Sequence, residues 1–343
     1  MNYDYKKIIM IGQSISTETK LTNGVYQNTI CEANTCIIMN SINFVVLGEQ
    51  TIANDFGKKG TATDLTLYDK KESDVIRTWV IPNGFPEKIQ PLLQAVNIAE
   101  YVIFYIASLD KYVGEQIIAL DMLGKKDGII SHSYEVDENR LNSMIKGTVL
   151  ANYKKVDSPN IKQELTKFPS ISSDGAAQIV IDHCFDVKGV GTVVLGKVLQ
   201  GIVNQYDKLR HLPSGSEIMI KSIQMHDDDV KQAICSARVG LSLKGIKPDE
   251  IQRGDILTID DSLEVKTELV INFNQSPFYK GEISENQMCL LNVGLQIKAA
   301  KISSISPFKL TLEKPIIYKK NDICIVIKPE STTVRIIGSG KIN

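Results

Sequence analysis

The sequence lacks the features that assign a protein to a membrane, to secretion or to a highly charged partner. No apolar run approaches the ~20 residues that a membrane-spanning helix needs, and the run Ile8–Ile11, which follows Lys6 and Lys7, is too short for the core of a signal peptide. Charge of one sign is also missing, since 39 Lys and Arg face 40 Asp and Glu, a net charge of −1. The six cysteines form no dense framework, which fits a reducing compartment. These absences predict a cytoplasmic protein that does not associate with a membrane.

The first half of the chain alternates short apolar runs with stretches of helical spacing. Between residues 86 and 101, and again between 114 and 124, apolar side chains recur every three or four positions, as in amphipathic helices. Buried runs separated by helices predict a mostly parallel sheet in an α/β domain. The apolar runs that we expect to be its strands lie at 8–12, 36–40, 44–48, 78–81, 101–107 and 128–130.

Beyond a linker at 169–175 the helical period disappears, and short strand-like runs separated by turn residues replace it. Residues 226–229, His-Asp-Asp-Asp, lie between two such runs and are interpreted as a hairpin tip, the alternative being a cation site. Regularly spaced short strands predict two β-barrels or sandwiches. The domains are placed at 1–170 (α/β), 175–262 (β-barrel) and 263–343 (β-barrel). Expected strands of the last domain include 263–273, 289–302, 309–318, 323–328 and 334–340.

Two stretches of the second domain resemble one protein family. The hairpin pattern G-x-G-T-V-V-x-G-x-V-x-x-G and the later pattern V-G-x-x-L-x-G-I-x-x-x-x-I-x-R-G resemble the second domain of translational GTPases of the elongation factor Tu and SelB type. The usual Ala-Gly ahead of the second pattern has no clear counterpart. Residues 276–282, 291–296 and 335–340 look like the third domain of the archaeal members. The matched residues are Gly189, Gly191, Thr192, Val193, Val194, Gly196, Val198 and Gly201, then Val239, Gly240, Leu243, Gly245, Ile246, Ile251, Arg253 and Gly254.

The resemblance implies a phosphate-binding loop, G-x-x-x-x-G-K-[ST], after the first strand of the α/β domain. Residues 12–19, Gly-Gln-Ser-Ile-Ser-Thr-Glu-Thr, follow the first apolar run. The second glycine is replaced by Thr17 and the lysine by Glu18. A lysine ~4 Å from a phosphate contributes about 4 kcal/mol of attraction at an effective dielectric near 20, and a carboxylate would repel instead. The candidate residues of this degenerate loop are Gly12, Ser14, Ser16, Thr17 and Thr19.

Two further nucleotide motifs of the family are missing. Where D-x-P-G-H is expected, residues 81–86 read Ile-Pro-Asn-Gly-Phe-Pro, so only Gly84 remains as a candidate nucleotide contact. Where N-K-x-D is expected, residues 133–137 read Ser-Tyr-Glu-Val-Asp. The three losses affect phosphate, metal and base, and they predict a pseudo-GTPase without catalytic residues, metal or cofactor. GTP or GDP with magnesium would bind only if a non-standard site functions.

Charge is distributed unevenly between the two predicted barrels. Residues 263–343 hold 11 Lys and Arg against 7 Asp and Glu, a net of +4, whereas residues 175–262 hold 10 against 12, a net of −2. The lysines of the C-terminal barrel fall in two neighbouring strands and their connection. They are interpreted either as ordinary solubilising charges or as phosphate contacts along an RNA stem, because in the family this domain lies against tRNA. These lysines are Lys309, Lys314, Lys319, Lys320 and Lys328.

The sequence thus predicts an elongation-factor-like protein of translation that binds tRNA or the ribosome, with GTP binding and hydrolysis lost or weakened. One alternative is a working but non-standard GTPase that uses Thr19 and main-chain amides. A second alternative is an interaction module that docks a translation-related protein without RNA. Whether the amino-acid pocket that the family has between its first two domains survives is left open.

Overall fold

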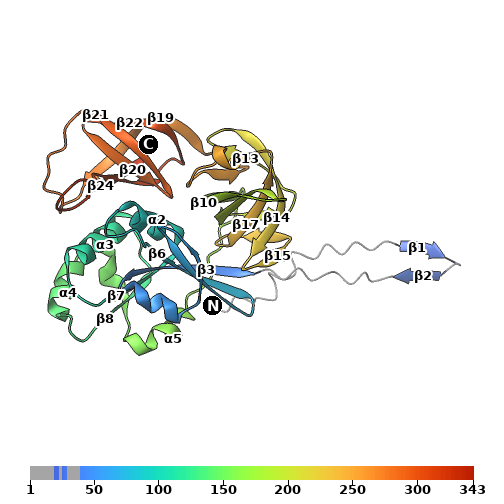
Figure 1. Ribbon diagram of the computed structural model, residues 1–343, viewed down its shortest axis with the longest axis horizontal. Coiled ribbons are helices and arrows are strands. Elements are labelled where there is room, and N and C mark those ends of the chain that lie inside the picture. The colour runs from blue at the N-terminus through green and yellow to red at the C-terminus, as the bar shows by residue number, and fades with distance from the viewer. Residues whose placement is uncertain (1–18, 23–24, 29–38) are drawn as a thin grey trace. The chain divides into compact units, whose positions relative to one another are not determined.

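The computed structural model describes residues 19–22, 25–28 and 39–343, and the chain divides into two units, residues 1–37 and 38–343. In the first unit, β1 (Thr19–Thr22) pairs antiparallel with β2 (Val25–Asn28). The expected strand at 8–12 and the candidate loop residues Gly12, Ser14, Ser16 and Thr17 lie outside the described residues. Thr19 opens β1. The second unit contains an α/β domain and two barrels (Figure 1).

The α/β domain contains a seven-stranded sheet in the order β4-β5-β6-β3-β7-β8-β9. The strands β3, β6, β7, β8 and β9 run parallel, and β5 runs antiparallel to both of its neighbours, β6 and the edge strand β4. The expected mostly parallel sheet is therefore confirmed, as a mixed sheet. Strands β4 and β5 were not expected, because only the first three residues of β5 are buried. The bounds are β3 (Asn40–Gly48), β4 (Lys58–Ala62), β5 (Thr66–Glu72), β6 (Val75–Ile81), β7 (Tyr101–Ile106), β8 (Gly128–His132) and β9 (Lys154–Lys155).

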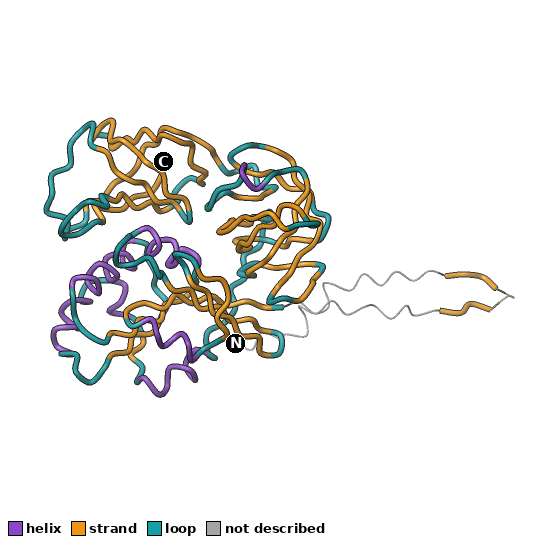
Figure 2. The backbone as a smooth tube through the Cα atoms, in the orientation of Figure 1, coloured by secondary structure: helices purple, strands orange, loops and turns teal. Residues whose placement is uncertain are grey.

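Helices cover both faces of this sheet (Figure 2). Val45, Leu47 and Phe104 point to one face and pack with α2, α3 and α4, while Phe44 and Val46 point to the other and pack with η1 and α5. The carboxyl half of β3 is therefore apolar on both faces. The helices are α2 (Gln90–Ile98), α3 (Lys111–Met122), α4 (Glu138–Ile145) and α5 (Ile161–Leu165), with 3₁₀ turns η1 (Gln50–Asp55), η2 (Val149–Asn152) and η3 (Ser158–Asn160).

The first barrel closes through six antiparallel strands in the order β13-β18-β10-β11-β17-β14, with β14 pairing back to β13. Gly189 and Gly191 have φ of +83° and +92° at the β10–β11 turn, a conformation that glycine adopts without strain. The bounds are β10 (Gln178–Val187), β11 (Gly191–Gln200), β12 (Ile202–Asn204), β13 (Lys208–Leu212), β14 (Ser216–Met225), β15 (Asp228–Val230), β16 (Gln232–Ile234), β17 (Arg238–Lys244), η4 (Pro248–Glu250) and β18 (Ile256–Thr258).

The acidic hairpin of this barrel is tighter than expected. Only His226 and Asp227 form the turn, with φ of 49° and 67°. Asp228 and Asp229 continue into β15, and the Asp228 carboxylate accepts a hydrogen bond from Lys71 at 2.5 Å. Across the described ranges, no three potential metal ligands gather around one point. The hairpin interpretation is therefore confirmed, with a shorter tip.

The second barrel closes in the order β19-β22-β21-β20-β23-β24. The run 289–302, expected as one strand, is two strands that turn at Gly294, where φ is +55°. No helix in the described part of the chain is long and apolar enough to cross a membrane. The bounds are β19 (Glu264–Gln275), β20 (Met288–Val293), β21 (Gln296–Ile305), β22 (Phe308–Tyr318), β23 (Ile323–Ile327) and β24 (Ile336–Ile342).

Candidate functional site

The carboxyl ends of the parallel strands are where α/β domains usually bind ligands. The central strand is β3, and the loop at its carboxyl end is 48–57, a different segment from the candidate loop 12–19. The Gly48 N–H donates to Oε1 of Gln116 at 2.8 Å, and the Glu49 N–H donates to the Tyr105 carbonyl at 2.7 Å. These amides point into the domain, whereas a phosphate-binding loop turns such groups toward its ligand.

Glu49 places a carboxylate at this strand end. Its side chain accepts hydrogen bonds from the Thr51 hydroxyl at 2.7 Å and the Thr51 N–H at 3.1 Å, which together lower the pKa of Glu49. Counted from Gly48, the phosphate-loop lysine falls on Asn54, whose Oδ1 accepts a hydrogen bond from the Tyr68 hydroxyl at 2.7 Å. The loop thus ends in a short 3₁₀ turn and carries negative charge.

The segment after β6 holds Gly84, a candidate nucleotide contact. The Gly84 N–H donates to the Asp64 carbonyl at 3.1 Å, and a Cβ at Gly84 would lie 2.8 Å from Cγ of Pro91. Ile81 and Phe85, which stand in place of the family's aspartate and histidine, are both buried in apolar cores. This segment therefore offers packing surface where the family pattern has polar groups.

The segment after β8 also uses its polar groups internally. The Asp137 carboxylate caps α4 by accepting from the N–H groups of Asn139 and Arg140 at 2.9 and 3.1 Å. The Ser133 hydroxyl donates to the Ala107 carbonyl at 3.0 Å. Tyr134 is 94% exposed. The side chains of Ser133 and Asp137 thus form hydrogen bonds with main-chain groups of the protein itself.

A buried ion pair joins the α/β domain to the first barrel. Lys197, between two matched residues of β11, pairs with Glu100 and also donates to the Ile98 carbonyl at 2.5 Å. Burial would raise the pKa of Glu100, but the attraction of Lys197 and hydrogen bonds from Asn43 outweigh it and hold the pKa below its ordinary value. The Asn43 amide continues across the interface to the Ser236 carbonyl at 2.9 Å.

A second ion pair joins the α/β domain to the second barrel. The Arg335 guanidinium binds the Glu115 carboxylate of α3, and its Nη1 donates to the Pro86 carbonyl at 2.8 Å. It also lies 5.5 Å from the centre of the Phe85 ring. Arg335 thereby holds the segment after β6 in place.

Arg253, the arginine of the second matched pattern, lies at the first interface too. Its guanidinium forms a bidentate pair with Asp64, at 2.6 and 2.8 Å, and lowers the pKa of that carboxyl through these hydrogen bonds. Its Nε donates to the Asp182 carbonyl at 3.0 Å. The matched arginine therefore bridges the two domains.

A groove of about 280 Å³ lies between β4 and β5 of the α/β domain and β14 and β17 of the first barrel. Arg238 lines it and donates to the buried Asp182 carboxylate through Nη2. Its Nε and Nη1 are buried without a hydrogen-bond partner among the described residues. Burial would raise the pKa of Asp182, but Arg238 and His183, 3.2 Å away, lower it to about 2. Other polar lining residues are Lys58, Lys59, Asp69, Gln224, His226 and Asp227.

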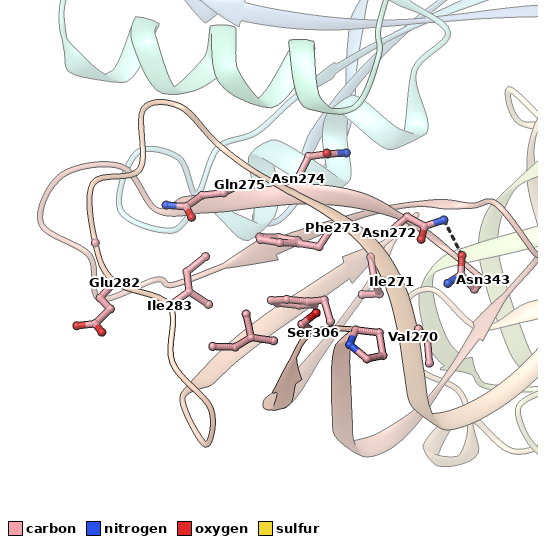
Figure 3. A pocket seen from close by; sticks show the side chains of 14 residues that line it. Val270, Ile271, Asn272, Phe273, Asn274, Gln275, Glu282, Ile283, Ser306 and Asn343 are labelled. Atoms are coloured by element: carbon pink, nitrogen blue, oxygen red, sulfur yellow. Dashed lines mark hydrogen bonds between the residues drawn. The ribbon is translucent and has the colours of Figure 1, made fainter.

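A larger groove of about 790 Å³ lies in the second barrel, between the end of β19, residues 281–283 and the turn 305–308 (Figure 3). Phe273 points into it and stacks on Phe308, with ring centres 4.1 Å apart. Asn272, Asn274 and Gln275 lie along its upper strand (Figure 3). This groove has an apolar floor and a rim of side-chain amides with one carboxylate, that of Glu282.

The five candidate RNA-contact lysines do not gather in one place. Strands β22 and β23 follow each other in sequence but are not neighbours in the barrel. The prediction that these lysines lie in neighbouring strands was therefore wrong. Lys309 and Lys314 lie in β22, whose 11 residues span roughly 36 Å at about 3.3 Å each. Lys319 pairs with Asp260 at 3.3 Å. Lys320 and Lys328 flank β23.

The comparisons with known proteins agree with this architecture. The sequence family described as elongation factor Tu domain 2 matches residues 191–258. An uncharacterised protein of Methanocaldococcus jannaschii is 37% identical over 298 residues, which cover 85% of this chain and 96% of that protein. The selenocysteine-specific elongation factor of the same organism is 27% identical over 311 residues, covering 79% of this chain and 64% of that factor.

Among solved structures, elongation factor SelB of Methanococcus maripaludis, in complex with the GTP analogue GPPNHP, aligns with a TM-score of 0.76 at 21% identity, covering 89% of this chain and 79% of SelB. The chain belongs to the translational GTPase-like family of elongation factor Tu and SelB. It spans less than two thirds of the length of the selenocysteine-specific factor.

The sequence patterns missed Arg238, Lys197 and the loop 48–57. Lys197 stands inside the matched hairpin, and Arg238 directly precedes the matched Val239. A charged residue inside an otherwise apolar pattern was the available signal in both cases. Gly48 at the end of an apolar run was the signal for the loop.

Proposed function

We propose that this protein acts in translation by binding aminoacylated tRNA, alone or on the ribosome, without a GTP cycle. The groove beside Arg238 receives the aminoacyl group, and that group is anionic. The carrying observation is the buried guanidinium of Arg238, two of whose nitrogen atoms, Nε and Nη1, have no hydrogen-bond partner among the described residues. An unpaired buried donor costs about 1–3 kcal/mol, and a carboxylate or selenolate that reaches either nitrogen would satisfy it.

The charge around the groove supports an anionic ligand. Lys58, Lys59 and His226 line it together with Arg238. Two acidic residues also line it: Asp69 accepts the Thr78 hydroxyl at 2.7 Å, and Asp227 lies in the turn before β15. Asp182 accepts a hydrogen bond from Nη2 of Arg238 and leaves Nε and Nη1 for a ligand. The name of the selenocysteine-specific relative fits this chemistry, because a selenol is ionised at neutral pH.

The loss of the GTP cycle is supported by the carboxyl edge of the sheet. Glu49 adds negative charge where a triphosphate would need cations, and the amides of Gly48 and Glu49 are already used. Ile81 and Phe85 can neither coordinate magnesium nor position water. The interfaces with both barrels are held by ion pairs that need no nucleotide.

Aminoacyl-tRNA binding at moderate salt, measured by fluorescence anisotropy without nucleotide, tests the proposal. We expect tRNA charged with aspartate, glutamate or selenocysteine to bind more tightly than tRNA charged with alanine or left uncharged. Arg238→Gln should weaken binding of the anionic forms by about tenfold, because charged hydrogen bonds contribute about 1.5–3 kcal/mol. Arg210→Gln is the matched control, since Arg210 lies on the same barrel and its partner Asp261 is exposed.

Equal affinity for all charged and uncharged tRNAs would exclude the groove beside Arg238 as the site of the aminoacyl group. No association with tRNA or ribosomes would overturn it entirely. Tight, saturable binding of a fluorescent GTP analogue would support the working GTPase instead. Circular dichroism of Arg238→Gln separates a lost contact from a lost fold.

A further inference from the structure

The end of β19 carries a strand edge that no other strand covers. β19 pairs with β22 only as far as Ile271, opposite Phe308, but pairs with β24 as far as Gln275, opposite Gly338. Within the described residues, β19 pairs with these two strands alone. Residues 272–275 therefore have a partner on one side only.

The direction of the free main-chain groups follows from the bonds to β24. The Asn343 N–H donates to the Val270 carbonyl at 3.1 Å, and the Ser276 N–H donates to the Ile337 carbonyl at 2.8 Å. Successive residues of a strand turn their N–H and C=O groups to opposite edges, so even-numbered residues here face β24. The main-chain groups of Phe273 and Gln275 face the other way, into the groove of Figure 3.

The apolar floor of the groove is fixed by glycines of β24. A Cβ at Gly338 would lie 2.7 Å from Cζ of Phe273, so only glycine lets this ring lie against the strand. The ring stacks on Phe308 with an interplanar angle of 14°. Ile283 faces the same space (Figure 3). An entering side chain thus meets a surface that is already in place, which reduces the entropy cost of binding.

We infer that this groove, which we call the β19 groove, docks an extended acidic segment of a partner protein as an added strand. Main-chain donors and acceptors at alternate residues match an extended polypeptide, whereas an RNA stem offers no such ladder. The barrel has a net charge of +4, from 11 basic and 7 acidic residues between 263 and 343. Lys309 and Lys341 stand opposite Val270 and Asn272 on the flanking strands, whereas Glu282, the one charged side chain of the lining, lies at the other end of the groove (Figure 3). Apolar side chains of the segment enter the groove, and acidic ones lie between them.

A pool of heptapeptides tests this with the whole protein. Each peptide has Val, Ile or Phe at alternate positions and Glu, Asp or Thr between them, and binding is measured by affinity selection followed by fluorescence polarisation. We expect saturable binders, and amide exchange at Phe273 and Gln275 that slows when they are bound. A pool without a binder overturns the inference.

N-methylation of the best binder tests the added strand itself. Two isomers carry methyl groups on alternate amides, one set on each edge of the extended peptide. Since only one edge pairs with β19, one isomer should lose binding and the other keep it. Equal binding of both isomers would overturn the added strand.

A pair of surface variants locates the site. Ile305→Glu, at a residue of the groove that is 45% exposed, should weaken acidic binders about tenfold through like-charge repulsion. Met288→Glu, at a residue of the same barrel that is 51% exposed and outside the groove, should leave them unchanged. Equal losses in both variants, or competition by an RNA duplex that Ile305→Glu does not affect, would contradict a peptide site. The tRNA binding proposed above is measured separately with Arg238→Gln, so either proposal can fail alone.

Discussion

At the carboxyl ends of its parallel strands, the α/β domain has a carboxylate and two buried apolar side chains, whereas on the surfaces that meet the barrels it has buried ion pairs. Glu49, Ile81 and Phe85 stand at the first surface. Glu100 and Glu115 stand at the second, paired with Lys197 and Arg335. The difference teaches that the surfaces facing the barrels are constrained independently of the carboxyl edge, because a buried charge without its partner is costly.

The largest expected effect comes from breaking a barrel contact. Lys197→Ala leaves the Glu100 carboxylate buried without its ion pair, and loss of one member of such a pair costs about 3–5 kcal/mol. Denaturant unfolding should show the loss. The matched control is Lys208→Ala, whose partner Glu217 is 67% exposed, so that the cost is about 0–1 kcal/mol. Equal losses would mean that the first interface contributes no more than a surface pair.

The next largest effect is expected from acid, which should lower the free energy of unfolding through Asp182, the carboxylate beside Arg238. The pKa of Asp182 is about 2 in the folded protein against an ordinary value of 3.8. The unfolded chain therefore takes up the proton first as pH falls. About 2 kcal/mol of stability, present above pH ~4, should be lost between pH ~4 and ~2.

Urea unfolding from pH 6 to pH 2 measures this loss against Asp182→Asn. The variant lacks the titrating group, so its stability should fall less steeply in that window. Parallel curves for the two proteins would show that Asp182 is not the group responsible.

A smaller effect is expected at the carboxyl edge of the parallel strands. Glu49→Ala removes the carboxylate that caps η1 and should cost about 1 kcal/mol, as other lost caps do. Glu135→Ala changes an exposed carboxylate near the same edge and should cost less. Thermal unfolding compares the two. If Glu49→Ala also created affinity for GTP, repulsion by this one carboxylate would be the main obstacle to GTP binding.

No effect is expected from GTP or GDP with magnesium on the melting temperature. A site filled at 100 times its dissociation constant would add about 2.7 kcal/mol, which differential scanning fluorimetry detects. Aminoacyl-tRNA with an anionic amino acid should raise the melting temperature in the same assay. A rise in melting temperature with GTP alone would show that the carboxyl edge of the sheet binds nucleotide.

Local pattern was sufficient to predict much of the fold. The runs 44–48, 78–81, 101–107 and 128–130 became β3, β6, β7 and β8, because a buried parallel strand is apolar at every position. The barrel hairpin was predictable from turn glycines such as Gly189. Strand β5 was missed, since Lys70, Lys71 and Glu72 at its end are exposed.

The sites were less predictable, because they depend on residues distant in sequence. Arg238 meets Asp182, 56 positions away, and Lys197 meets the Ile98 carbonyl, 99 positions away. The lysines near β22 and β23 looked clustered only because strands consecutive in sequence were assumed to be neighbours.

By itself, the sequence determined the order of an α/β domain and two barrels, because the period of apolar residues and the turn glycines are local properties. It also determined the family, through many residues at fixed spacing. Only the tertiary structure decided that β3 is the central strand and that loop 48–57 stands at its end, because strand order depends on pairing between distant segments. Within the described part of the chain, the same pairing left an arginine with two unpartnered nitrogens in one groove and an unpaired strand edge in another.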